Sequence, residues 1–463
     1  MKRLTTYILA FIAIWATWLL LCPYYLRLLE GFDFYTALPD FWNLNLDIEE
    51  SVFRGISGYM LQFYAYPAAG AAIHAFLSIL MVLSVDLTVR KIFKDSDNLI
   101  WIAFAFLPLI THQLIKDISL VPALKCLAIS LSVTAAAYLL SFRVKPFIPM
   151  PGFLKNIWSA SVIMVIILGI SGYMVYDKLV KSGSEELAYM DYLVEEKNWD
   201  KILEEIQPQY AQQNGTIRKY ALLALSQKGI LTDKAFAYGL SSSNDFLFHK
   251  TDQAILRNFN MKFYSCLGMH NTTIHYAFQQ ATQFHLSMNF NAARSLADTY
   301  LELKDYTLAK KHIEILSHSS CHSRWVEERM EKLESIKGCT PEYSEINQKH
   351  MWGKMIPDMY FMTERYPEDK RYREYLLCSL LADRKVGKFY EAFQKTYHEG
   401  EPVPFLYQEA LLTIIGRQPE ELRKYDISPD IFMAFRDFEQ LAFTGKRTNA
   451  KRKYAGTYWA YLL

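Results

Sequence analysis

The sequence predicts an all-α protein in which five transmembrane helices are followed by a soluble, irregular, tetratricopeptide-like α-solenoid. Long apolar runs fill residues 1–178, whereas residues 179–463 show amphipathic helices with short breaks and no run of strands. The first region ends with Asn156–Tyr176, a stretch of 21 residues without a charge. About 20 apolar residues form a helix that crosses a bilayer, so we predict that the chain leaves the membrane here.

The charge and the motifs of the sequence predict neither a nucleic-acid partner nor a cofactor. The 463 residues carry a net charge of only +2, which gives no basis for a polyanionic partner such as nucleic acid. The six cysteines are scattered and include no CxxC pair, so no disulfide framework is predicted. No glycine-rich phosphate loop, HExxH motif or dinucleotide-binding fingerprint occurs, and we predict no cofactor.

Five membrane spans are predicted within residues 1–178. The first uncharged run lacks a small-x-small cleavage site at its end, so we interpret it as an uncleaved span rather than a signal peptide. Residues 23–66, rich in aromatic and acidic side chains, are predicted to form a loop and a helix at the membrane surface. The predicted spans cover about 4–22, 67–88, 98–115, 121–142 and 156–176.

The run Gly55–Val85 is the ambiguous part of this assignment. Its 31 uncharged residues would make roughly 46 Å of helix at 1.5 Å per residue. That length exceeds one span but cannot hold two spans and a turn. We predict an interfacial or re-entrant helix before Pro67 and one span after it. If the run crossed twice, the C-terminal region would lie on the opposite side.

The short loops predict the orientation. Eight basic residues fall on one side of the predicted spans and three on the other. Because basic loops stay in the cytoplasm, the N-terminus is predicted to be cytoplasmic, and five spans then place the C-terminal region outside, in the periplasm of a bacterium. The residues on the first side are Lys2, Arg3, Arg90, Lys91, Lys94, Arg143, Lys145 and Lys155, and those on the second are Arg27, Arg54 and Lys116.

The stretch 292–316 carries the clearest repeat signal. Its spacing is similar to the tetratricopeptide pattern, in which small residues let two helices approach and larger ones fill the space around them. The spacing recurs at Trp199, Ile202 and Ile206 and at Phe389, Ala392 and Thr396, without a fixed period. The predicted packing residues are Leu296, Ala297, Tyr300, Tyr306, Ala309, Ile313 and Leu316.

Two interpretations of residues 179–463 remain open. Helical hairpins stacked as an irregular solenoid have a concave surface that binds a peptide or protein, whereas a closed helical domain has none. The leading hypothesis is a non-enzymatic inner-membrane protein whose periplasmic helical domain binds another envelope protein. Its predicted partners are the lipid bilayer and that protein.

The acidic loop after the first span suggests an alternative, enzymatic function. Membrane glycosyltransferases that use polyprenyl-phosphate donors place a carboxylate in their first outer loop, where it acts as a base or a metal ligand. Asp33, Asp40 and Asp47 occupy comparable positions. The alternative hypothesis is therefore a lipid-linked glycosyltransferase or a related envelope-polymer enzyme.

Other polar residues give weaker signals. His318, Cys321 and His322 have the i, i+3, i+4 spacing of metal ligands on one helix face, but no fourth ligand accompanies them, and a solvated turn fits as well. His74 and His112 lie within apolar runs, where ionisable groups can mark a transport path. The basic, aromatic tail 446–463 either docks on anionic lipid or folds back to cap the last hairpin.

Several stretches together resemble a family of bacterial inner-membrane proteins that is common in the Bacteroides group. Members pair an N-terminal multi-spanning region with a C-terminal helical-repeat domain. The resemblance implies the two-part architecture and no activity. It is carried by GYMLQFYAYPAAGA at 58–71, NGTIRKYALLALSQKGILTDKAF at 214–236, the hairpin at 292–316, REYLLCSLLADRKVGKFYEAF at 373–393 and GTYWAYLL at 456–463.

Overall fold

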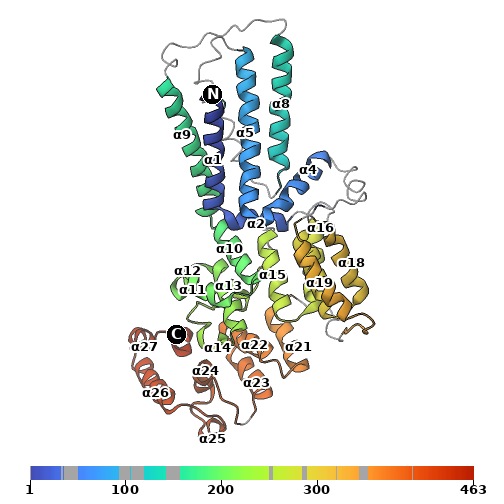
Figure 1. Ribbon diagram of the computed structural model, residues 1–463. Coiled ribbons are helices and arrows are strands. Elements are labelled where there is room, and N and C mark those ends of the chain that lie inside the picture. The colour runs from blue at the N-terminus through green and yellow to red at the C-terminus, as the bar shows by residue number, and fades with distance from the viewer. Residues whose placement is uncertain are drawn as a thin grey trace. The chain divides into compact units, whose positions relative to one another are not determined.

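The computed structural model describes residues 2–32, 35, 51–92, 105, 119–141, 157–249, 254–283, 289–319, 321–343, 353–398 and 400–463. These residues form helices and turns and contain no strand, in agreement with the predicted all-α class (Figure 1). The chain divides into two compact units, unit 1 with residues 1–192 and 277–342 and unit 2 with residues 193–276 and 343–463. The division predicted from the sequence, at residue 178, was based on the change in composition. The two units differ from it because they are defined by which residues pack together.

Among the described residues of unit 1, four helices are long and apolar enough to cross a membrane. Their most apolar windows have a mean hydropathy between 1.7 and 2.1, and large apolar side chains such as Trp158 and Leu139 stay exposed, as on lipid-facing helices. They match four predicted spans, and the predicted span 98–115 lies outside the described residues except for Ala105. The helices are α1 (Lys2–Leu21), α5 (Pro67–Ile92), α8 (Val121–Ser141) and α9 (Ile157–Val175).

α1 runs antiparallel to α5. Near the start of α1, Tyr7 donates a hydrogen bond to the carboxylate of Asp86 at 2.7 Å. Near its end, Trp15 Nε1 donates to the Ala68 carbonyl at 3.0 Å. Asp86 is fully buried and also pairs with Arg3 and Arg90. This carboxylate therefore fastens the start of α1 to the end of α5.

α8 runs parallel to α5. Ser84 bonds Ser130, and Thr88 bonds Thr134 at 2.9 Å, both at a constant separation of 46 residues. A constant separation requires that both helices advance in the same direction. The end of α5 and the start of α8 therefore lie at opposite ends of this helix pair.

The run Gly55–Val85 contains a helix break at the predicted place. α4 (Ser51–Leu61) continues as a short 3-10 helix, η1 (Gln62–Ala65), before α5 begins at Pro67. Proline disfavours a helical conformation in the residue before it, and Tyr66 is extended (φ −110°, ψ 103°). α5 extends four residues beyond the predicted end of the span, to Ile92.

Beyond α9 the chain stays helical. A π-helix, η3 (Tyr176–Val180), follows it directly, and three turn residues then lead into α10 (Ser184–Glu195). The last residue of the turn, Gly183, has a φ of 80°, a conformation in which glycine is unstrained. The apolar helix is thus joined to α10 by a connection of only a few residues.

The predicted hairpin at 292–316 is present in unit 1 as α17 (Phe290–Glu302) and α18 (Tyr306–Ser317), and α19 (Ser323–Ser335) packs against α18. The Asp305 side chain caps α18 by accepting a hydrogen bond from Leu308 N at 2.9 Å. Tyr306, at the first position of α18, is only half-buried and does not fill the core as predicted. The other predicted packing residues are buried: Leu296, Ala297, Tyr300, Ala309, Ile313 and Leu316.

Among the described residues, a turn with a basic residue at its left-handed position precedes three helices, α11 (Trp199–Glu205), α18 and α23 (Val386–Thr396). In each turn a basic residue, Lys197, Lys304 or Arg384, adopts a positive φ of 53–56°. The next residue donates a backbone hydrogen bond to the carbonyl five positions earlier, at 2.8–2.9 Å, as in the Schellman motif. The turns lie 107 (304 − 197) and 80 (384 − 304) residues apart, so the hairpins recur without a fixed period. A tetratricopeptide-like solenoid stays a prediction.

Unit 2 is built from short helices. At the predicted repeat positions Ile202, Ile206, Phe389 and Ala392 are buried. Its other helices are α12 (Pro208–Gln213), α13 (Gly215–Gln227), α14 (Leu231–Lys234), η4 (Ser243–Asp245), α15 (Ala254–Cys266), the first turns of α16 (His270–Gln283), α21 (Met355–Arg365), α22 (Lys370–Ala382), α24 (Phe405–Ile415), α25 (Pro419–Leu422), α26 (Pro429–Phe443), α27 (Arg447–Lys453) and α28 (Tyr458–Leu462).

The tail folds back onto unit 2. Tyr458 and Trp459 are 1% and 2% exposed. Trp459 Nε1 donates to the Glu409 carbonyl at 2.9 Å, and the Tyr458 hydroxyl donates to the Leu381 carbonyl at 3.1 Å. The second of the two predicted arrangements of the tail is therefore present for these aromatic residues.

Candidate functional site

A short helix that follows α1 contacts several other elements of unit 1. α2 (Pro23–Gly31) is separated from the end of α1 by a single residue, Cys22, and has proline in its first turn. The first amides of a helix have no partner within it. Here Tyr24 N and Tyr25 N donate to the two carboxylate oxygens of Glu185 on α10, at 3.0 and 2.7 Å. A residue 161 positions away in sequence thus caps α2.

Aromatic side chains surround this cap. The Tyr24 ring lies 4.5 Å from that of Tyr189 and 5.3 Å from that of Tyr192, centroid to centroid. Arg27 lies over the Tyr192 ring at 4.6 Å, a cation–π distance. Burial raises the pKa of Glu185 from 4.5 to about 7, against the opposing effect of the two backbone hydrogen bonds.

The other end of α2 contacts α17 and the start of α19. Glu30, 8% exposed, meets His322 with Oε1 and Nε2 2.6 Å apart, an ion pair when the imidazole is protonated. His322 stacks on Phe290, with ring centroids 3.9 Å apart. A Cβ on Gly31 would lie 2.3 Å from the Asn291 side chain, so α2 and α17 approach closely here. We call Glu185, Glu30, Gly31, His322 and Phe290 the α2 junction.

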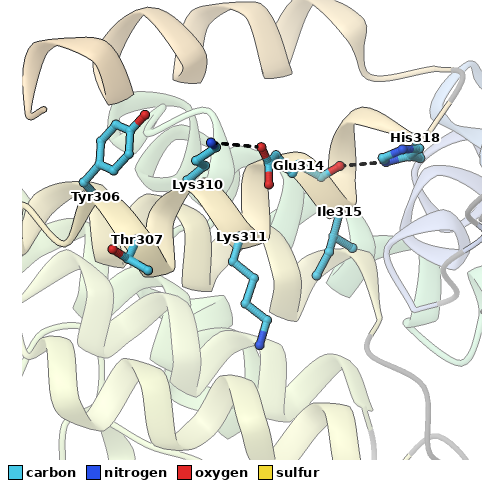
Figure 2. Close-up of a pocket in the computed structure, with 7 residues that line it drawn as sticks. All are labelled: Tyr306, Thr307, Lys310, Lys311, Glu314, Ile315 and His318. Carbon is cyan, nitrogen blue, oxygen red and sulfur yellow. Dashed lines mark hydrogen bonds and ion pairs between the residues drawn. The ribbon is translucent and has the colours of Figure 1, made fainter.

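The outer face of α18 forms a hollow of about 660 Å³ (Figure 2). Lys310 pairs with Glu314 at 3.5 Å, and the Lys311 side chain extends away from that pair. The half-buried side chains of Tyr306 and Ile315 add apolar surface. The lining residues are Tyr306, Thr307, Lys310, Lys311, Glu314, Ile315 and His318.

The three predicted metal ligands have separate surroundings. His318 Nδ1 hydrogen-bonds the Glu314 carbonyl at 2.8 Å on the α18 face, while His322 pairs with Glu30. Burial, and secondarily the charge of Glu30, raises the pKa of the Cys321 thiol. Among the described residues, no group of three His, Cys, Asp or Glu side chains is arranged to hold a metal ion.

The other candidate residues are placed as follows. Asp33, Asp40 and Asp47, which carry the glycosyltransferase alternative, lie outside the described residues, as does His112. His74 is buried in the apolar bundle, where its ring stacks on Trp18 at 4.1 Å and meets the Tyr64 ring edge-on. Aromatic packing therefore accounts for its position without a transport path.

Comparison with protein-family models identifies the family of the chain. A family of unknown function, DUF6057, matches over residues 1–175 and 113–463. The chain belongs to this family. No curated protein and no solved structure matches it. The sequence analysis did not predict the α2 junction. Since no relative of known function matches, the evidence for it is its geometry alone.

The pKa of Glu185 predicts a pH dependence. Its folded-state pKa of about 7 lies above its ordinary value of 4.5, so the stabilisation from the neutral carboxyl is complete below pH 4.5 and is lost as the pH rises through 7. Allowing for its partial exposure, we expect a loss of about 1–2 kcal/mol between pH 5 and 8.5. Thermal unfolding in detergent should show a smaller pH dependence for Glu185→Gln. An equal dependence in both proteins would contradict this account.

The Glu30–His322 pair predicts a coupling energy. Removal of either partner leaves a polar group poorly solvated, so Glu30→Ala and His322→Ala should each destabilise unit 1 by about 1–3 kcal/mol. The double variant should fall short of the sum by about 1 kcal/mol or more. The measurement is a double-mutant cycle of unfolding in detergent, with the exposed Glu327→Ala as a control. Additive effects would show that the two side chains do not interact.

Proposed function

We propose that this chain is an integral protein of a bacterial inner membrane that holds a helical binding domain against the periplasmic face of the bilayer. The domain binds another envelope protein, and the chain acts as a scaffold. The observation that carries this proposal is the α18 hollow, on a hairpin attached to a membrane-proximal helix through the α2 junction.

The helix directions support five crossings. With the 46-residue register of α5 and α8, Val121 lies level with residue 75, and the 17 residues from 75 to 92 rise about 26 Å. The chain between Ile92 and Val121 has to cover this distance in the return direction. The predicted span 98–115 would be about 27 Å long as a helix, which fits the return.

The charges support the orientation. Lys2 and Arg3 begin α1, and Arg90 and Lys91 end α5, so the antiparallel pair gathers four basic residues at one end. By the positive-inside rule this end faces the cytoplasm. α2, which follows the other end of α1, then lies on the periplasmic side, together with the hairpin that it contacts.

The α18 hollow supports protein binding. Interface centres combine aromatic and aliphatic anchors with polar groups at the rim, and Tyr306, Ile315 and Lys311 provide these on one helix face. Lys311 is exposed and has no ion pair within the described part of the chain. We therefore expect the partner to present a carboxylate next to an apolar side chain.

Charge reversal in the hollow provides the test. Lys311→Glu should reduce the yield of the partner in affinity capture from native membranes in mild detergent by about tenfold, since a rim contact becomes repulsive. Lys332→Glu makes the same charge change at an exposed position of α19 and should leave the yield unchanged. Capture should also fail without residues 179–463. Equal capture by all these proteins would overturn the proposal.

A further inference from the structure

The end of α26 leaves an aromatic ring in solvent. Phe443, its last residue, is 73% exposed. The chain then turns at Gly445, with a φ of 78°, and forms α27. This turn and α27 carry basic side chains that are all exposed. We call Phe443, Lys446, Arg447, Lys451 and Arg452 the basic surface.

The four charges of the basic surface are not neutralised nearby. None of the four forms an ion pair within the part of the chain that the structure describes. The neighbouring acids of α26 are engaged elsewhere, since Asp437 pairs with Lys453 at 2.7 Å and Glu439 with Arg417 and Arg436 at 3.1 and 3.0 Å. The surface therefore keeps a charge of about +4.

The basic surface rests on packed helices. Trp459 of α28 lies 5.2 Å from the Phe435 ring and 5.7 Å from the Phe438 ring of α26. Tyr454, which ends α27, joins the same cluster at 5.9 Å from Trp459. Tyr454 and Trp459 are thus used internally, whereas Phe443 stays 73% exposed beside the basic residues, with the Arg417 guanidinium over its ring at 5.2 Å.

We propose that the basic surface binds the anionic phospholipid headgroups of the bilayer in which the chain is anchored. Clusters of four or more Lys and Arg residues bind anionic lipid headgroups, and an exposed aromatic ring beside them inserts at the boundary between headgroups and acyl chains. The contact holds unit 2 on the membrane through a surface separate from the α18 hollow.

The bilayer is the partner that the chain itself provides. Unit 2 has 205 residues (84 + 121), and a compact unit of this size has a radius of gyration of about 17 Å. Unit 2 is covalently joined to the apolar helices, and this tether gives a high effective concentration of headgroups. An acidic protein partner would have to be supplied separately.

Photo-crosslinking of the full-length chain tests the proposal. Phe443→p-benzoylphenylalanine places a photoreactive ring at the exposed position. In nanodiscs that hold one chain each, it should form a phospholipid adduct at least about fivefold more often with phosphatidylglycerol present than with phosphatidylcholine alone, since each basic residue near an anionic surface contributes about that factor. The same photoreactive residue at Met433, which is 67% exposed on the same helix, should give few adducts.

Charge variants complete the test. Lys446→Gln with Arg447→Gln should reduce the lipid adduct by about tenfold or more, whereas Arg423→Gln with Lys424→Gln, exposed basic residues before α26, should leave it unchanged. Equal adduct yields in the two lipids, or equal losses in the two double variants, would overturn the proposal. The same chain irradiated in native membranes should yield lipid adducts, and adducts with another protein instead would identify an acidic protein partner and overturn it.

Discussion

The parallel alignment of α5 and α8 is the constraint on which the rest of the account depends. Their hydroxyl pairs, Ser84 with Ser130 and Thr88 with Thr134, keep one register, so the end of α5 and the start of α8 lie at opposite ends of this helix pair. Between apolar helices, such polar contacts contribute specificity because side-chain hydroxyls have no water to bond in a bilayer. The register, together with the antiparallel α1, separates the basic end of the bundle from the end that carries α2.

The α2 junction connects the helix that follows α1 to the rest of unit 1. Glu185 caps one end of α2, and Glu30 contacts His322 near the other. Nine residues that follow the first apolar helix are thereby connected to α10 and to the α17–α19 hairpin. A helix held at both ends transmits position better than a flexible loop, which supports the idea that the hollow of α18 is held at a defined orientation to the apolar helices.

Sequence patterns predicted the features that depend on local spacing. The length of the apolar runs predicted four of the helices, and Pro67 predicted the break before α5. The small residues Ala297 and Ala309 predicted a close-packed hairpin. Contacts between residues far apart in the sequence could not be predicted from such patterns, as Glu30 and His322 show, which are 292 residues apart.

The predicted metal ligands fail for a local reason. α18 ends at Ser317 and α19 begins at Ser323. The i, i+3, i+4 spacing of His318, Cys321 and His322 therefore spans a helix break. Tyr306 fits the repeat pattern but sits at the first turn of α18, where a side chain is half-covered.

The central claim is that the chain crosses the membrane between α5 and α8, so that the helical domains lie opposite the N-terminus. The most direct measurement compares two reporters, one active only in the periplasm and one active only in the cytoplasm, fused in separate constructions after Ile92 and after Leu463. The account predicts cytoplasmic activity for the fusion after Ile92 and periplasmic activity for the fusion after Leu463. Activity of both fusions on the same side of the membrane would contradict it.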